Sequence, residues 1–261
     1  MNRILKAITA LFFILTFALD IFSQNVSPVQ LGADVMSRYI WRGVNLGGSS
    51  PSIQPWLKYS VSSKDSNHAL TIGAWSAYTF SQTSNQEVDL YLTYTYKSVI
   101  SLTVTDYFFP EYYNTKGRSR YFNYDKDSTC HVYEGVISFN GTEKIPFTFL
   151  FAINFYGNDA RKININGTSG DIFMTKYIEV GYKKNIKGTD FNAFIGAALD
   201  KPNMDRGELG FYGNKTAGVI NLGVKASKSI QISDKYSLPV QASLITNPEA
   251  ENIFLTFGIS F

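Results

Sequence analysis

Arginine and carboxylate side chains are spaced along this chain so that several could share one face of an extended segment. Arg38 and Arg42 are four residues apart, and Glu87 and Asp89 are two residues apart. Residues an even number apart on a β-strand point to the same side. A guanidinium either binds an anion or pairs with a carboxylate through two parallel hydrogen bonds. The arginine pair therefore has two interpretations, an anion contact or a structural ladder with acids such as Asp89 and Glu87, and the ladder is preferred.

Histidine and cysteine add little further chemistry. The chain has two histidines, His68 and His131, and one cysteine, Cys130. No pattern near His131 would position it for catalysis, so we interpret it as a surface residue. A single cysteine excludes an intramolecular disulfide, and so few histidines and cysteines make a zinc site unexpected. We expect neither enzymatic activity nor a cofactor.

Alternation of apolar and polar residues with a period of two recurs along the chain and predicts β-strands. Between residues 87 and 97, for example, Val88, Leu90 and Leu92 oppose Asp89 and Thr93. Most segments have close to the ~10 residues that a tilted membrane strand needs. The twelve segments cover, approximately, residues 30–44, 52–62, 69–80, 87–97, 99–109, 130–139, 147–157, 173–185, 189–199, 216–228, 237–246 and 253–261.

The last nine residues, IFLTFGISF, carry the clearest alternation. Ile253, Leu255, Phe257 and Ile259 share one apolar face, which ends at Phe261. A strand with one apolar face that ends on an aromatic residue is typical of the closing strand of a bacterial outer-membrane barrel. Phe261 is therefore predicted to be the signal that the barrel-assembly machinery reads.

The connections between the predicted strands are sorted by length. Counted from the N-terminus, every second connection is short, and three of the others are long polar stretches: Pro110 to Thr129, Asn158 to Ile172 and Asp200 to Lys215. Long loops at one end and short turns at the other are the arrangement of outer-membrane barrels. The sequence therefore predicts an all-β, transmembrane antiparallel barrel of about 12 strands, with long extracellular loops and short periplasmic turns.

The N-terminus has the features of a secretory signal. Arg3 and Lys6 precede an apolar run over residues 7–19, which is too short to span a bilayer comfortably. We expect residues 1–23 to be a signal peptide and residues 24–261 to form the barrel in the outer membrane.

Composition fits this class. Aromatic residues make up 15% of the chain and charged residues only 17%, while the mean hydropathy is −0.08. The formal net charge of +3 is too small to indicate nucleic acid as a partner.

If the polar face of each strand points inward, the interior holds balanced charge, which predicts either a weakly selective pore or charges paired across a narrow interior. The basic residues in this set are Arg38, Arg42, Lys58, Lys97, Lys183 and Lys225, and the acidic ones are Asp34, Glu87, Asp89, Glu134, Glu179 and Asp200. The leading candidates for lining the lumen are Arg38, Arg42, Lys58, Asp89, Glu134 and Glu179.

Several segments resemble the TorF porin family. The run Tyr39, Arg42 and Gly43, followed by a Gly/Ser loop and Pro51, resembles the start of that family. The segments TIGAWSAY and DLYLTYTYKSVISLTVTDYFFP are similar to two of its hairpins. The resemblance implies a barrel of the porin kind more firmly than it implies a solute.

The sequence therefore predicts an outer-membrane, porin-like channel for passive passage of small polar solutes or ions. The alternative is a barrel that transports nothing and whose extracellular loops bind a ligand or partner protein. The expected partners are outer-membrane lipid, the barrel-assembly machinery and small polar solutes, and the oligomeric state is open. The lumen distinguishes the two functions: it is open and wet in a pore, and closed by salt bridges and inserted loops in a binding scaffold.

Overall fold

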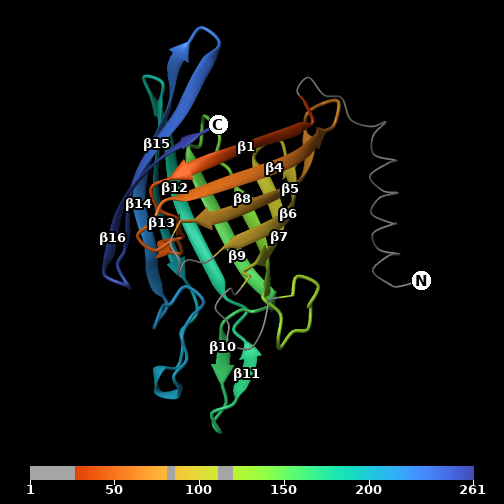
Figure 1. Cartoon of the computed structure of the whole chain (residues 1–261), viewed down its shortest axis with the longest axis vertical. Coiled ribbons are helices and arrows are strands. Elements are labelled where there is room, and N and C mark those ends of the chain that lie inside the picture. The colour runs from red at the N-terminus through yellow and green to blue at the C-terminus, as the bar shows by residue number, and fades with distance from the viewer. Residues whose placement is uncertain (1–26, 81–85, 111–119) are drawn as a thin grey trace, which may run out of the picture.

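The computed structural model describes residues 27–80, 86–110 and 120–261, so the predicted signal peptide, residues 1–23, lies outside the described residues. Twelve antiparallel strands close into one barrel, which confirms the predicted fold class (Figure 1). The barrel strands, in ring order, are β1 (Val29–Met36), β4 (Ser52–Ser62), β5 (His68–Thr79), β6 (Glu87–Tyr96), β7 (Ile100–Phe108), β8 (His131–Phe139), β9 (Phe147–Gly157), β12 (Lys176–Ile186), β13 (Thr189–Ala198), β14 (Gly218–Ser233), β15 (Tyr236–Asn247) and β16 (Asn252–Ser260).

Each barrel strand pairs with its neighbours in the chain, and β1 closes the ring against β16. The connections are sorted by length as predicted. Short turns join β4 to β5, β6 to β7, β8 to β9, β12 to β13 and β14 to β15 at what we call the short-turn end. The opposite, long-loop end holds the long connections after β1, β7, β9 and β13, together with a short β15–β16 turn of residues 248–251. The C-terminus lies at the short-turn end, away from the loop hairpin β10–β11 (Figure 1).

The predicted alternation sets which side chains face outward. In β6, Leu90 and Leu92 are 44% and 43% exposed on the outside of the barrel, while Asp89 is 6% exposed on the inside. The same alternation holds in β16, where Leu255 is exposed and Thr256 is buried. An apolar outer face and a polar inner face follow, and a one-residue shift in register would reverse both.

The first predicted strand, residues 30–44, is wrong in its second half. The barrel strand β1 ends at Met36, and the chain then forms a small hairpin of β2 (Ile40–Trp41) and β3 (Val44–Asn45). The chain bends at Ser37 and Arg38, directly after β1, and reverses at Arg42 and Gly43, whose positive φ angles form the turn between β2 and β3. Arg38 and Arg42 consequently do not lie on one barrel strand.

Three other regions differ from the prediction. The loop after β9 contains a second hairpin, β10 (Arg161–Ile163) with β11 (Ser169–Ile172), and the loop after β13 contains the 3₁₀ helix η1 (Met204–Arg206). Strand β14 runs to Ser233 rather than residue 228, so the β14–β15 hairpin extends beyond the barrel body (Figure 1). No helix among the described residues is long and apolar enough to cross a membrane.

Candidate functional site

Residues 37–51, here called the mouth hairpin, leave β1 and cross the long-loop end of the barrel interior. Tyr39 reaches Glu87 on β6, and Arg42 reaches Glu134 on β8. Strand β8 is the fifth strand from β1 around the ring, so the hairpin spans the lumen to the far wall. Further contacts join Trp41 to Tyr107 on β7, Arg42 to Tyr177 on β12, and Gly43 to Asn247 on β15.

A tight two-residue turn forms the tip of the mouth hairpin. Trp41 pairs with Val44, and the residues between them, Arg42 and Gly43, have φ angles of 48° and 77°. Positive φ at both central positions is the type I′ geometry that two-residue hairpins favour. The backbone of Gly43 lies against the carbonyl of Ile220 on β14, where a Cβ atom would have no room. Glycine is therefore required there for both conformation and space.

The tip of the turn places the Arg42 guanidinium in a closed set of partners. Nη1 and Nη2 donate to the two carboxylate oxygens of Glu134 at 2.5 and 2.9 Å. Nη1 also donates to the hydroxyl of Tyr212 at 2.7 Å, and the Tyr177 ring centroid lies 4.6 Å from the guanidinium carbon. Tyr107 donates its hydroxyl to Glu134 at 3.0 Å. The pair is buried: the Arg42 side chain is 10% exposed and that of Glu134 is 1% exposed.

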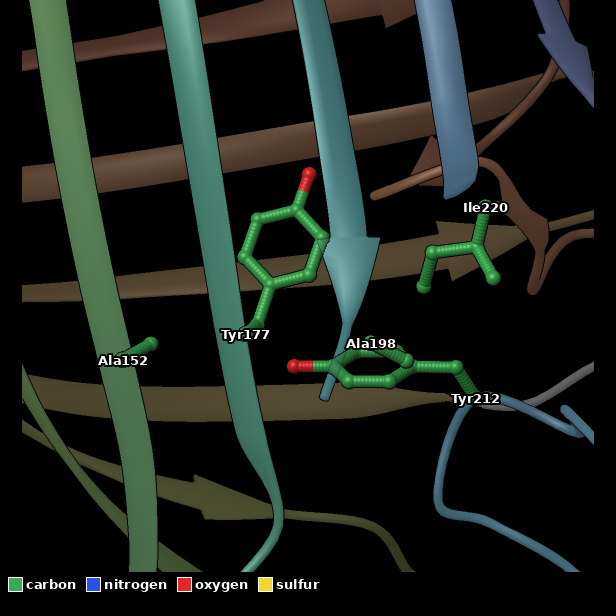
Figure 2. Packing of buried hydrophobic residues seen from close by; sticks show 5 residues of the cluster. All are labelled: Ala152, Tyr177, Ala198, Tyr212 and Ile220. Atoms are coloured by element: carbon green, nitrogen blue, oxygen red, sulfur yellow. The ribbon is translucent and has the colours of Figure 1, made fainter. Parts of the chain in front are cut away.

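Aromatic side chains surround this ion pair. Tyr177 on β12 and Tyr212 from the loop after β13 lie close to one another, with ring centroids 5.5 Å apart, and Ile220 lies nearby on β14 (Figure 2). Trp41 packs against both Tyr212 and Phe211 from the same loop. Two connections, the mouth hairpin and the loop 199–217, thus fill this level of the barrel together.

The Arg42–Glu134 pair has the geometry that makes a buried ion pair tolerable. Desolvating two charges is costly and is offset only when the remaining donors and acceptors are satisfied. Here Tyr107 and Tyr212 supply those additional hydrogen bonds. Removing one member of such a pair leaves an uncompensated buried charge, which typically costs about 3–5 kcal/mol.

The expected ladder between the arginines and the acids of β6 is absent from the described residues. Glu87 accepts a hydrogen bond from Tyr39 at 2.7 Å, and Oδ1 of Asp89 is buried with no hydrogen-bond partner among them. Arg38 contacts the carbonyl of Gly48 within the mouth hairpin at 3.4 Å. The end of β1 at Met36 explains the difference, because it places both arginines in the mouth hairpin, where Arg42 meets Glu134 on β8 and Arg38 meets only the hairpin's own backbone.

The other predicted lumen residues occupy different levels. Glu179 on β12 accepts hydrogen bonds from Tyr177 and from Asn221, at 2.5 and 2.9 Å. Lys58 on β4 lies farther toward the short-turn end, with its ammonium 5.2 Å from the centroid of the Trp56 ring. Glu179 and Lys58 therefore each contact other side chains and do not pair with one another.

Phe261 follows the last residue of β16 and extends its pairing. Its backbone N–H donates to the carbonyl of Ala33 on β1 at 2.9 Å, and its carbonyl accepts from the Ala33 N–H at 3.3 Å. The Phe261 side chain is exposed on the apolar outer face. Its role as an assembly signal stays a prediction.

Below the mouth, the inner wall carries pairs of small hydroxyl side chains beside larger rings, such as Tyr91 over Gly73 and Trp56 over Gly32. The hydroxyl side chains hydrogen-bond along the wall to the neighbouring strand, and they are half-buried, so they remain accessible to water. Small side chains paired in this way do not fill the space in front of them. The pairs are Ser60 with Thr71 at 2.9 Å, Thr93 with Thr103 at 2.9 Å, and Thr95 with Ser101 at 3.1 Å.

The buried wall acids and the inner lysines lie at different depths along their strands, a feature that counting inward residues missed, and Asp190 near the β12–β13 turn is an acid outside this pattern. Strands β4, β6, β8, β12 and β14 all run from the long-loop end to the short-turn end. The wall acids Glu87, Asp89, Glu134 and Glu179 fall within the first four residues of their strands. The lysines Lys58, Lys183 and Lys225 are the seventh or eighth residues of theirs.

His131 is not a surface residue. It is fully buried at the rim of the barrel, where Nδ1 lies 2.7 Å from a carboxylate oxygen of Asp106 and Nε2 lies 2.6 Å from the carbonyl of Tyr121. The rings of Phe108 and Tyr124 lie 4.7 Å from its own. Both ring nitrogens therefore face oxygen atoms of the fold. The residue anchors a loop to the rim and has no free nitrogen for catalysis.

Glu208 ties two of the long loops together. Its carboxylate accepts the backbone N–H of Ile163 through Oε1 at 2.8 Å and that of Asn203 through Oε2 at 2.7 Å. These two backbone hydrogen bonds lower the pKa of Glu208 below its ordinary value, because they favour the charged form. The β10–β11 hairpin and the loop 199–217 therefore form one connected layer over the mouth.

Solved structures similar to this chain are outer-membrane barrels. The NanC porin shares 10% identity, with a TM-score of 0.42 over 88% of this chain and 98% of that one. An outer membrane channel from Pseudomonas putida F1 shares 9% identity, with a TM-score of 0.44 over 93% and 97%. Salmonella typhi OmpF in complex with daunomycin shares 8% identity, with a TM-score of 0.39 over 92% and 99%.

A closed antiparallel barrel with an apolar outside, a polar inside and long loops at one end is the architecture of bacterial outer-membrane β-barrels. Residues 23–147, a little less than half of the chain, match the profile of a family described as "Bacterial protein of unknown function (Gcw_chp)". No curated protein sequence matches the chain.

Proposed function

We propose that this chain is an outer-membrane channel for small polar solutes or ions, and that the mouth hairpin closes its outer mouth in the conformation described above. We further propose that the chain belongs to the TorF porin family and that the β10–β11 hairpin and its neighbouring loops lie outside the cell. In this proposal the protein catalyses no reaction.

The change in burial along the inside of the barrel carries this proposal. At the long-loop end, Glu87, Glu134 and Tyr177 are each 1% exposed. At the short-turn end, Thr93 and Thr103 are half-buried and bonded only along the wall. Twelve strands lie between the eight of filled barrels and the sixteen or more of open porins. A channel with a movable constriction needs water-accessible space on the inner side of the constriction. The half-buried wall behind the mouth hairpin fits that requirement.

Opening such a channel means withdrawing the mouth hairpin. The contacts that would break are the Arg42–Glu134 pair and the Tyr39–Glu87 hydrogen bond, together with the aromatic contacts of Trp41. The barrel wall would not need to unfold, because β1 and β4 are already paired up to Met36 and Ser52. The moving part is therefore confined to the connection.

The plugged mouth also favours the second candidate, a barrel whose outer loops bind a ligand. Arg161 on β10 is held by Asp127 and by the carbonyl of Gly170, beside an open polar pocket of about 520 Å³ between two loops. A binding scaffold needs such loops and needs no passage. Transport measurements therefore separate the two candidates.

Swelling of liposomes with small neutral sugars tests the proposal. We expect purified protein to admit sugars slowly, and Arg42→Ala to admit them faster because the hairpin loses its main anchor. Arg38→Ala is the matched control and should behave like the wild type, because Arg38 is bonded only within the hairpin. Folded wild-type and Arg42→Ala barrels that are both impermeable would support the binding scaffold instead.

A further inference from the structure

We propose that the position of the Arg42 guanidinium is a recognition site for cationic solutes that carry a guanidinium group, and that Arg42 occupies this site as a tethered internal competitor. The inference deepens the proposed function by naming a solute class. Binding at the site does not itself depend on whether the barrel conducts.

Most of the groups that hold the guanidinium do not belong to the mouth hairpin. Glu134 is on β8, Tyr177 is on β12, and Tyr212 is in the loop after β13. Glu134 is held by the hydroxyl of Tyr107 on β7, independently of Arg42. When the hairpin withdraws, Trp41 leaves with it, but the carboxylate, the Tyr177 ring and the Tyr212 hydroxyl remain. The site is therefore built into the wall and the neighbouring loop.

The geometry of this site suits a guanidinium better than an ammonium. Two nitrogens donate in parallel to the two oxygens of Glu134, a fork that a single ammonium cannot reproduce. The guanidinium carbon lies 4.6 Å from the Tyr177 ring centroid, within the range of cation–π attraction. A free guanidinium solute would satisfy the same donors and the same ring.

The surrounding charge also selects for cations. At this level the wall contributes the carboxyl groups of Glu87, Asp89, Glu134 and Glu179, of which Glu87 and Asp89 are hydrogen-bonded to each other and so share a proton, whereas Arg42 is the one inward-facing cation that the described part of the chain supplies there. Oδ1 of Asp89 is already buried without a partner. Withdrawal of Arg42 therefore leaves a mouth of acids that repels anions and attracts cations.

Thermal unfolding of detergent-solubilised Arg42→Ala, followed by heat modifiability on gels, tests the binding site directly. The probe is methylguanidinium chloride at low millimolar concentration, with equal concentrations of methylammonium chloride and sodium chloride as controls. We expect methylguanidinium to raise the unfolding midpoint of Arg42→Ala by several degrees and in a saturable way. The wild type should not respond, because its own Arg42 fills the site.

One further variant and one further measurement keep the test decisive. Glu134→Gln in the Arg42→Ala background should abolish the response, because the bidentate carboxylate is gone. If Arg42→Ala does not fold alone, the yield of refolding with and without methylguanidinium becomes the measurement, and rescue by methylguanidinium alone is expected. No response, or an equal response to all three salts or in the wild type, overturns the inference.

A separate recording distinguishes this inference from the channel proposal. Arg42→Ala in a planar bilayer under a salt gradient should give a reversal potential that favours cations. If Arg42→Ala binds methylguanidinium but does not conduct, the binding-site inference stands and the channel proposal is contradicted. If Arg42→Ala conducts but does not respond to methylguanidinium, the channel proposal stands and the binding-site inference is contradicted.

Discussion

Arg42 and Glu134, 92 residues apart in the chain, join the mouth hairpin to the far wall of the barrel through two parallel hydrogen bonds of 2.5 and 2.9 Å. The pair sits where the carboxylates of the inner wall gather and where the interior is most tightly filled. It is the strongest single link between the hairpin and the wall among the described residues. Under the proposed channel function, breaking this link opens the mouth.

Loss of that link should lower the stability of the folded barrel substantially. Arg42→Ala leaves Glu134 buried and unpaired, so we expect the free energy of unfolding to fall by about 3–5 kcal/mol. Arg38→Ala removes one long hydrogen bond near the surface and should change it by less than about 0.5 kcal/mol. Denaturant titration of the refolded barrels measures both. Similar losses for the two variants would mean that the buried pair is not the anchor.

Two glycines of the mouth hairpin give a matched comparison of conformation and space. Gly43 and Gly48 both have positive φ, 77° and 62°, but a Cβ at Gly43 would collide with the carbonyl of Ile220, whereas nothing lies within 4 Å of one at Gly48. Gly48→Ala should cost only the backbone strain of about 1–2 kcal/mol.

Gly43→Ala should also displace the tip of the hairpin and raise the permeability of liposomes to small sugars. The measurement is the swelling rate of the two variants side by side. Equal rates at wild-type level would show that the tip does not need to contact β14.

His131 should hold the loop that ends at Cys130 against the rim. His131→Gln cannot satisfy both Asp106 and the Tyr121 carbonyl in the same geometry. Loss of one or two buried hydrogen bonds should raise the population of the opened loop at least ~10-fold. Limited trypsin cleavage after Arg120 and Lys126 reports that opening.

The matched control is His68→Gln, at the short-turn end, where the ring hydrogen-bonds to the Tyr94 hydroxyl and lies near the Tyr96 ring at an exposed site. Its cleavage rate at Arg120 and Lys126 should equal that of the wild type. If His131→Gln is also cleaved at the wild-type rate, the rim contact does not hold the loop.

The link between the long loops should weaken in acid. The pKa of Glu208 is lowered in the folded protein by the backbone N–H groups of Ile163 and Asn203. A lowered carboxyl pKa means that its contribution is fully present above the unfolded value of about 4.3 and is lost as pH falls through the folded value. Hydrogen exchange at those two amides, corrected for intrinsic rates, should therefore accelerate below about pH 4 and not between pH 5 and 8.

Substitutions by glutamine separate this link from general acid effects. Glu208 accepts its two bonds on different oxygens, so Glu208→Gln must lose one of them. Glu249 accepts the N–H groups of Lys215 and Thr216 on a single oxygen, so Glu249→Gln can keep both. Faster exchange at Ile163 or Asn203 is expected for the first variant only. Equal effects would contradict the bridging role of Glu208.

The sequence was sufficient to predict the strands of the barrel wall, but not the hairpin that enters the barrel interior. Alternation in segments such as the one containing Leu90 and Leu92 reports a side chain's environment directly, so strand number and facing follow from it. The inward turn at Arg42 and Gly43 was missed because the polar and apolar residues around it continue the strand pattern. The available signal was Gly43 directly after Arg42, flanked by Trp41 and Val44, which is compatible with a two-residue hairpin turn.

Partner choice inside the barrel could not be predicted for a different reason. Glu87, Asp89 and Glu134 are equivalent in a list of inward acids, and only the position of the hairpin tip decides that Arg42 meets Glu134. The burial of His131 likewise depends on Asp106 and on a loop carbonyl that come together only in the folded chain. Long-range pairing of this kind leaves no local pattern in the sequence.

Single-channel recording of a barrel without the mouth hairpin tests the central claim most directly. Met36 and Ser52 are cross-strand partners, so residues 38–50 can be replaced by a short Asn-Gly turn that joins β1 to β4. We predict a folded, heat-modifiable barrel with a steady open conductance, while the wild type is mostly closed under the same conditions. A folded barrel that stays closed after this replacement, or one that conducts no more than the wild type, would contradict the claim that the mouth hairpin closes the channel.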